Sequence, residues 1–174
     1  MKILFVALLL LIPHAACPIE KQPPKPPPKT TLAEQIKAQE DSGEYPKLDR
    51  SSDLKGPDQN LNGVRDDVEA WINAQPITDV QKKAVMQYAE SFQKSLFVNL
   101  TDKGALQADL DEAAAAANCT FEAFSRDTAV ERKLTNKLEA ITFNTKERTM
   151  RYIAYNKALS GMSFRMPFGQ NTCK

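Results

Sequence analysis

Five oxygen-bearing side chains fall within twelve residues of this sequence, at a spacing that lets a tight loop turn them toward one centre. They are Asp58, Asn60, Asn62, Asp66 and Glu69. Proteins hold Ca²⁺ with roughly six to eight oxygen ligands at about 2.3–2.6 Å. The types and the spacing of these side chains therefore predict a calcium site in residues 58–69.

The same stretch resembles the EF-hand calcium loop, which supplies its ligands in a fixed order along twelve residues. The resemblance implies that Gly63 makes the sharp turn and that Arg65 stands where paired loops usually have an apolar residue. It implies six ligands, namely the side chains of Asp58, Asn60 and Asn62, the backbone carbonyl of Val64, Asp66 directly or through water, and both carboxylate oxygens of Glu69.

No second loop of this kind occurs in the sequence, and residues 54–57 (Leu-Lys-Gly-Pro) break any helix before Asp58. The stretch is thus similar to the lone calcium loops of various bacterial secreted proteins. Some uncharacterised bacterial lipoproteins have a similar run ending in Asn-Gly-Val-Arg-Asp-Asp-Val-Glu. We expect one weak, structural site, with a dissociation constant on the order of 10⁻⁴ to 10⁻³ M. The alternative is a solvated acidic turn that caps a helix at Asp66.

The N-terminus has the three parts of a secretory signal: a positive charge at Lys2, an apolar run over residues 3–12 and a small-residue exit. The apolar run is too short to cross a bilayer as a helix. Ala15-Ala16-Cys17 resembles a bacterial lipobox, although His14 stands where that motif usually has Leu. This resemblance implies that residues 1–16 are removed, that Cys17 carries palmitate and other lipid, and that Pro18 favours the outer membrane. Simple secretion is the alternative.

The remaining residues limit the chemistry that the mature chain can perform. Its basic and acidic residues balance once Lys2 is removed, and no basic block suggests a nucleic-acid partner. The one histidine, His14, lies in the signal segment, so the mature chain lacks the usual general base. Two cysteines remain, Cys119 and Cys173, and an oxidising compartment favours a disulfide between them. Two buried free thiols are the alternative.

Residues 17–57 read as a lipidated, disordered, Pro-rich tether and an irregular linker, because half of residues 18–29 are proline and residues 42–57 are rich in Ser, Asp, Gly and Pro. From residue 58 the chain reads as one helical domain that opens with the calcium loop and ends at residue 174. Apolar residues recur at helical spacing over 66–75, 78–100, 102–124, 128–141 and 145–158. Side chains of Thr78 or Asp79, of Asp127 or Thr128, and of Thr145 could cap three of these helices. The sequence predicts an all-α fold, a small antiparallel bundle of about four to five helices.

Three classes of function fit this organisation. The first is a membrane-anchored periplasmic lipoprotein, a non-enzymatic calcium-binding module whose helical surface binds another envelope protein. The second is an immunity lipoprotein that neutralises a toxin delivered into the periplasm. The third is an enzyme, for which the sequence offers no nucleophile–base pair, catalytic metal cluster or phosphate loop. The sequence favours the first, with calcium as the one cofactor and no catalytic residues.

Overall fold

The computed structural model describes residues 30–174 and is all-helical over that range. Its helices are α1 (Leu32–Asp41), α2 (Asp66–Asn73), α3 (Asp79–Ser95), α4 (Lys103–Ala123), α5 (Thr128–Thr142) and α6 (Lys146–Ala158). The predicted all-α fold is confirmed. The signal segment, Cys17 and the Pro-rich tether lie outside the described residues.

Each long helix begins at a side chain that satisfies the free backbone N–H groups of its first turn. Thr78 forms a reciprocal capping box with Gln81 at the start of α3. Asp127 accepts hydrogen bonds from two first-turn amides of α5, and Thr145 caps α6. These three caps are those that the sequence predicted. At the start of α4 the same role falls to Asp102.

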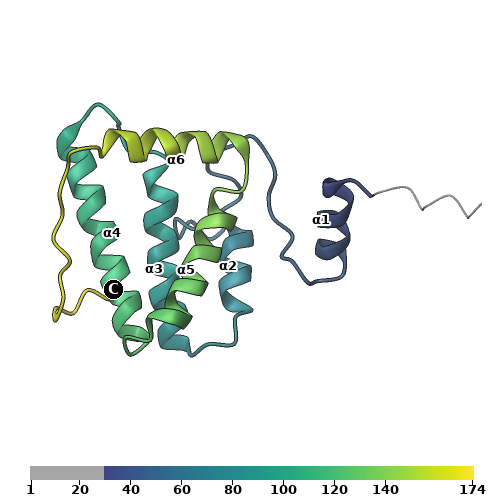
Figure 1. The fold of residues 1–174 in the computed structure, drawn as a ribbon, viewed down its shortest axis with the longest axis horizontal. Helices are drawn as coiled ribbons and strands as arrows, with labels where there is room; N and C mark the ends of the chain where they lie inside the picture. Colours follow the sequence, from purple (N-terminus) through teal and green to yellow (C-terminus); the bar gives the residue numbers. More distant parts are fainter. Residues whose placement is uncertain (1–29) are drawn as a thin grey trace, which may run out of the picture.

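Helices α2, α3, α4 and α5 form the bundle, and α6 lies across one end of it (Figure 1). The core cluster joins α2, α3, α5 and the end of α4, and comprises Val64, Val68, Trp71, Ile72, Val85, Ala89, Phe124, Leu134 and Leu138. Burying a side chain of this size stabilises the fold by about 1.5–3 kcal/mol. Arg151 holds α6 in place, because its guanidinium donates to the carbonyls of Leu96 and Val98 beyond the end of α3.

Some apolar residues that helical spacing assigned to the core are exposed. Val80 and Val130 lie near the starts of α3 and α5, and Met150 and Ile153 lie on the outer side of α6. The crossing of α6 explains the last two. It turns Arg148, Tyr152 and Tyr155 toward the bundle instead, with the Tyr152 ring stacked on Phe143 at 3.8 Å between centroids.

The predicted linker divides into two parts. Helix α1 stands apart from the bundle in Figure 1 and has no buried residue. Residues 49–57, by contrast, are irregular and are held against the bundle by hydrogen bonds from Arg148 on α6 and Gln93 on α3. The sequence placed the start of the helical domain at Asp58. In the structure, the packed part of the chain begins at about Asp49.

Within residues 30–174, none of the helices combines the length and the apolar character that crossing a bilayer requires.

Candidate functional site

The loop over residues 58–69 is folded around its own polar side chains. Asp58 accepts hydrogen bonds from the backbone amides of Asn62 and Gly63, at 3.1 and 3.3 Å. Asn60 accepts one from the Asn62 amide at 3.2 Å, and Asn62 one from the Val64 amide at 2.9 Å. Gly63 has φ +82°, the left-handed conformation that the sharp turn requires and that glycine adopts most readily. The side chains of Asp58, Asn60 and Asn62 are thus turned toward the interior of the loop.

Glu69 closes the loop from the first turn of α2. One of its carboxylate oxygens accepts hydrogen bonds from the side-chain amides of both Asn60 and Asn62, each at 2.9 Å. The third carboxylate, Asp66, accepts from the Gln59 amide at 3.0 Å through Oδ1. Its Oδ2 is buried and has no hydrogen-bond partner within residues 30–174. The structure therefore brings the predicted ligand side chains together in one loop.

Val64 has two roles in this loop, one for its side chain and one for its backbone carbonyl. Its side chain is buried in the core cluster, so its backbone carbonyl is the group that it can offer to a cation. This burial also fixes the loop to the domain.

To bind a metal ion, this loop would have to use side-chain amide and backbone carbonyl oxygens as ligands in addition to its carboxylates. In the described part of the chain, no group of three or more His, Cys, Asp and Glu side chains is placed to hold a metal ion. The three carboxylates Asp58, Asp66 and Glu69 would thus need Asn60, Asn62 and the Val64 carbonyl to complete a cation site. Mixed oxygen donors of this kind suit Ca²⁺, which accepts irregular coordination, better than Mg²⁺.

Arg65 anchors the loop to the end of α5, a role that sequence reasoning missed. Its side chain is fully buried and pairs with Asp67. The guanidinium also donates to the carbonyls of Ile141 and Thr142, at 2.9 and 3.1 Å. These carbonyls lie at the C-terminal end of α5, where helices leave unpaired acceptors and negative partial charge. The one signal in the sequence was the arginine at a loop position that is usually apolar.

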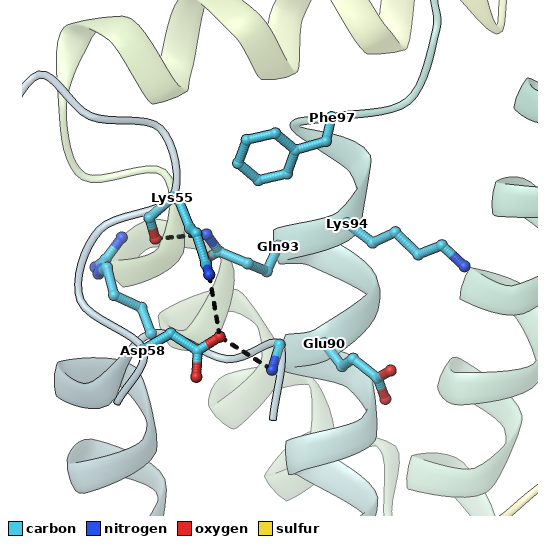
Figure 2. A pocket seen from close by; sticks show the side chains of 8 residues that line it. Lys55, Asp58, Glu90, Gln93, Lys94 and Phe97 are labelled. Atoms are coloured by element: carbon cyan, nitrogen blue, oxygen red, sulfur yellow. Dashed lines mark hydrogen bonds and ion pairs between the residues drawn. The ribbon is translucent and has the colours of Figure 1, made fainter. Parts of the chain in front are cut away.

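A cleft of about 300 Å³ opens beside the loop, between residues 55–58 and α3 (Figure 2). Asp58 forms one wall, and its side chain is only 4% exposed. The Lys55 ammonium group lies 3.9 Å from its Oδ2. The charged ends of Glu90 and Lys94 point away from the cleft and pair with Lys174 and Glu112. Lys55 is therefore the exposed cation that competes most directly with a bound metal for Asp58.

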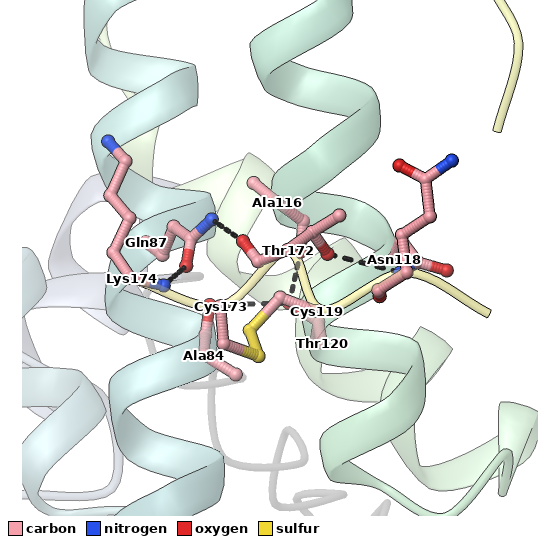
Figure 3. The surroundings of a disulfide bond; sticks show 10 residues. Ala84, Gln87, Ala116, Asn118, Cys119, Thr120, Thr172, Cys173 and Lys174 are labelled. Carbon is pink, nitrogen blue, oxygen red and sulfur yellow. Dashed lines mark hydrogen bonds between the residues drawn. A yellow bond between two sulfur atoms is a disulfide. The ribbon is translucent and has the colours of Figure 1, made fainter. Parts of the chain in front are cut away.

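The second predicted pair, Cys119 and Cys173, forms a disulfide with its Cα atoms 5.0 Å apart. It ties the C-terminal tail to the C-terminal part of α4 (Figure 3). Around it, Gln87 of α3 donates to the Thr172 carbonyl and accepts from the Lys174 amide. The tail therefore folds back on the bundle and is fastened to both α3 and α4.

No protein-family model matches this chain, and no curated protein and no solved structure matches it either. The class of this protein is thus described from its fold and its loop alone. Residues 30–174 contain an all-α domain with an oxygen-rich loop just before α2.

Proposed function

We propose that residues 58–69 bind one Ca²⁺ ion, and that the chain is a lipid-anchored, non-enzymatic envelope protein whose helical domain binds another envelope protein. The observation that carries the calcium proposal is the convergence of Asn60 and Asn62 on a single oxygen of Glu69. Asn60 and Asn62 lie nine and seven positions before Glu69 in the sequence. Their contacts with Glu69 support a loop in which these two early ligands and the last one share a common interior.

The loop has the oxygen ligands and the negative charge that a calcium ion needs. Each asparagine carbonyl oxygen accepts one backbone hydrogen bond and keeps a second lone pair. The N–H groups of the same amides partly offset the charge of Glu69. A bound cation would take over that role, and it would also supply the partner that Asp66 Oδ2 lacks. Leaving a buried acceptor unpaired costs about 1–3 kcal/mol.

The alternative, in which Asp66 caps the following helix, has less support. Helix α2 has Arg65 at its N-cap position, the Arg65 side chain makes no capping hydrogen bond, and the first-turn amide of Val68 donates to Asp67 rather than to Asp66. Asp66 Oδ1 instead accepts from Gln59, within the loop. A carboxylate that closes the loop is better explained by a ligand role than by capping.

Calorimetric titration with calcium tests the site. We expect a dissociation constant on the order of 10⁻⁴ to 10⁻³ M. Calcium at about 100 times that constant should add about 2.7 kcal/mol to the free energy of unfolding and raise the melting temperature by several degrees. Magnesium should do less, because it demands octahedral geometry and keeps its waters.

Two variants make this test specific. Glu69→Gln keeps the shape of the closing side chain and removes its charge, so most of the calcium shift should vanish while the helical content stays. Glu147→Gln is the matched control, because Glu147 also lies in the first turn of a helix, outside the loop. An unchanged melting temperature at about 100 times the expected dissociation constant, with no heat of binding, would reduce the loop to a structural turn.

The lipid anchor is tested separately on the full chain. In a bacterium supplied with labelled palmitate, the wild type should take up label and the Cys17→Ser variant should not. Equal labelling would leave simple secretion as the explanation. A partner can then be sought by crosslinking in envelope extract, and a captured toxin would favour the immunity role.

A further inference from the structure

A second cleft lies between α3, α4 and α6, and the C-terminal tail contributes Phe164 and Met166 to its wall. Its volume is about 220 Å³. Residues of α3, α4 and α6 line it together with the tail. Nothing in the calcium loop contributes to it, so it is a separate feature of the domain.

Most of the α4 wall of this cleft is made of small side chains. Beside Leu110 it contains Ala113, Ala114 and Ala117, part of the five-alanine run of α4. The neighbouring Ala115 lines a different hollow, toward Glu90 and Thr172. Because alanine side chains are short, this face of α4 leaves open the space that larger side chains would fill.

The facing wall is aromatic. Tyr88 and Phe92 of α3 stack with their ring centroids 4.6 Å apart. Tyr152 of α6 meets the Phe92 ring edge-on at 6.4 Å and lies 6.3 Å from Tyr155. All four rings line the cleft. The face of an aromatic ring carries negative partial charge, so such a wall attracts positive charge.

The carboxylates Glu131 and Glu139 act on the tyrosine rings of this wall. Among the described residues, none that lines the cleft is charged. Burial raises the pKa of Tyr88 to about 12, and Tyr152, Glu131 and Glu139 contribute to that rise. Burial also raises the pKa of Tyr152, again with a contribution from Glu139. The negative charges of Glu131 and Glu139 would repel an anion from this wall.

Asp109 of α4 is a buried carboxyl group next to the Tyr155 hydroxyl, outside the lining of the cleft. It is 3% exposed, and neither of its oxygens accepts a well-formed hydrogen bond within residues 30–174. Burial raises the pKa of Asp109, and the nearby Tyr155 hydroxyl and Lys94 act against that rise. Lys94, however, pairs with Glu112. A positive charge bound beside Tyr155 would favour the ionised form of this carboxyl group.

We propose that this cleft binds a small organic cation, an alkyl- or arylammonium group, with its charge against the tyrosine rings and its apolar part against the alanine face of α4. Aromatic side chains recognise quaternary ammonium groups in this way. The size is suitable, because a dry cavity of about 150 Å³ holds one benzene ring and this cleft is somewhat larger.

The test compares three probes of nearly equal shape by calorimetry or by NMR chemical-shift mapping. Benzyltrimethylammonium is the cation, neopentylbenzene is its neutral counterpart and phenylmethanesulfonate is an anion. We expect the cation to bind about tenfold more tightly than the neutral probe, from one cation–π contact or more. The anion should not bind. Equal binding of the cation and the neutral probe would overturn the proposal, as would binding of none of the three.

Two pairs of variants locate the site. Ala113→Leu should fill the cleft and abolish binding, whereas Ala115→Leu, on the other side of α4, should leave it unchanged. Tyr152→Leu should weaken the cation about tenfold, whereas Tyr152→Phe keeps the ring and should retain the affinity. Circular dichroism checks that each variant is folded. If Ala115→Leu weakens binding as much as Ala113→Leu does, or if Tyr152→Leu has no effect, the cation does not bind in this cleft.

Discussion

Arg148 and Asp49, which are 99 residues apart in the sequence, form an ion pair in which the arginine side chain is fully buried. The same guanidinium donates to the backbone carbonyls of Asp49 and Asp53, at 2.9 and 2.7 Å, and to the side chain of Asn144 at 2.9 Å. One side chain of α6 thus holds the segment that enters the domain.

Replacing Arg148 with Met should lower the free energy of unfolding by about 3–5 kcal/mol, because it leaves a charge and several carbonyls without their donor. Arg148→Lys should rescue little, since an ammonium group lacks the planar fork that reaches several acceptors at once. The exposed Arg165→Met is the control and should change stability by less than about 0.5 kcal/mol. Urea unfolding followed by circular dichroism measures all three. A loss below about 1 kcal/mol in Arg148→Met would contradict this role.

The same pair makes stability depend on pH in the acid range. Burial alone would raise the pKa of Asp49, but hydrogen bonds from Arg148 and Ser51 outweigh burial and hold the pKa at about 2. A lowered pKa means that the stabilisation is fully present above the ordinary value of 3.8 and is lost as the pH falls toward 2. Asp49→Asn should therefore melt below the wild type at neutral pH, and the difference should shrink between pH 4 and pH 2. A constant difference would show that ionisation of Asp49 does not matter.

Gly56 should tolerate alanine far less than Gly161 does. Both glycines have a positive φ, which costs an alanine about 1 kcal/mol or more. A Cβ on Gly161 would meet no atom within 4 Å, whereas a Cβ on Gly56 would overlap Cδ of Arg65 and lie 3.0 Å from Nη2 of Arg148. We expect Gly56→Ala to cost at least about 2 kcal/mol more than Gly161→Ala in thermal unfolding. Equal costs would mean that the two buried arginines can move aside.

Removing the disulfide should cost about 4 kcal/mol of stability in the chain-entropy model, since its cysteines are 54 residues apart in sequence. The Cys119→Ser, Cys173→Ser double variant should unfold at a lower urea concentration than the wild type. A reducing agent should shift the wild type to the same midpoint and leave the variant unchanged. Thiol titration of the unfolded, unreduced protein should find neither cysteine free. Two free thiols would show that the tail is fastened by other contacts.

Features that depend on residues close in sequence were predictable. Thr78, Asp127 and Thr145 cap the helices expected of them, because capping involves a side chain and amides at most three positions away. The candidate ligands are likewise confined to twelve residues, so their spacing alone indicates that they can meet.

Features that depend on packing were not predictable. Met150 and Ile153 have the spacing of a buried face, yet they are exposed because α6 lies across the end of the bundle. Arg65 and Arg148 have no apolar pattern that would place them inside, and both are buried because carbonyls from distant segments surround them. The aromatic cleft also combines three helices and the tail, and no single stretch of sequence contains it.

The disulfide also determines how the molecule responds to proteases. Cys119 lies within α4 and Cys173 lies in the tail after α6, so the bond closes a covalent ring that contains α5, α6 and most of the tail. The exposed turns at Arg126 and Gly161 lie inside this ring. A single cut in either turn would open the ring without releasing a fragment. The nicked protein would run as one species on a non-reducing gel and separate into two only after reduction.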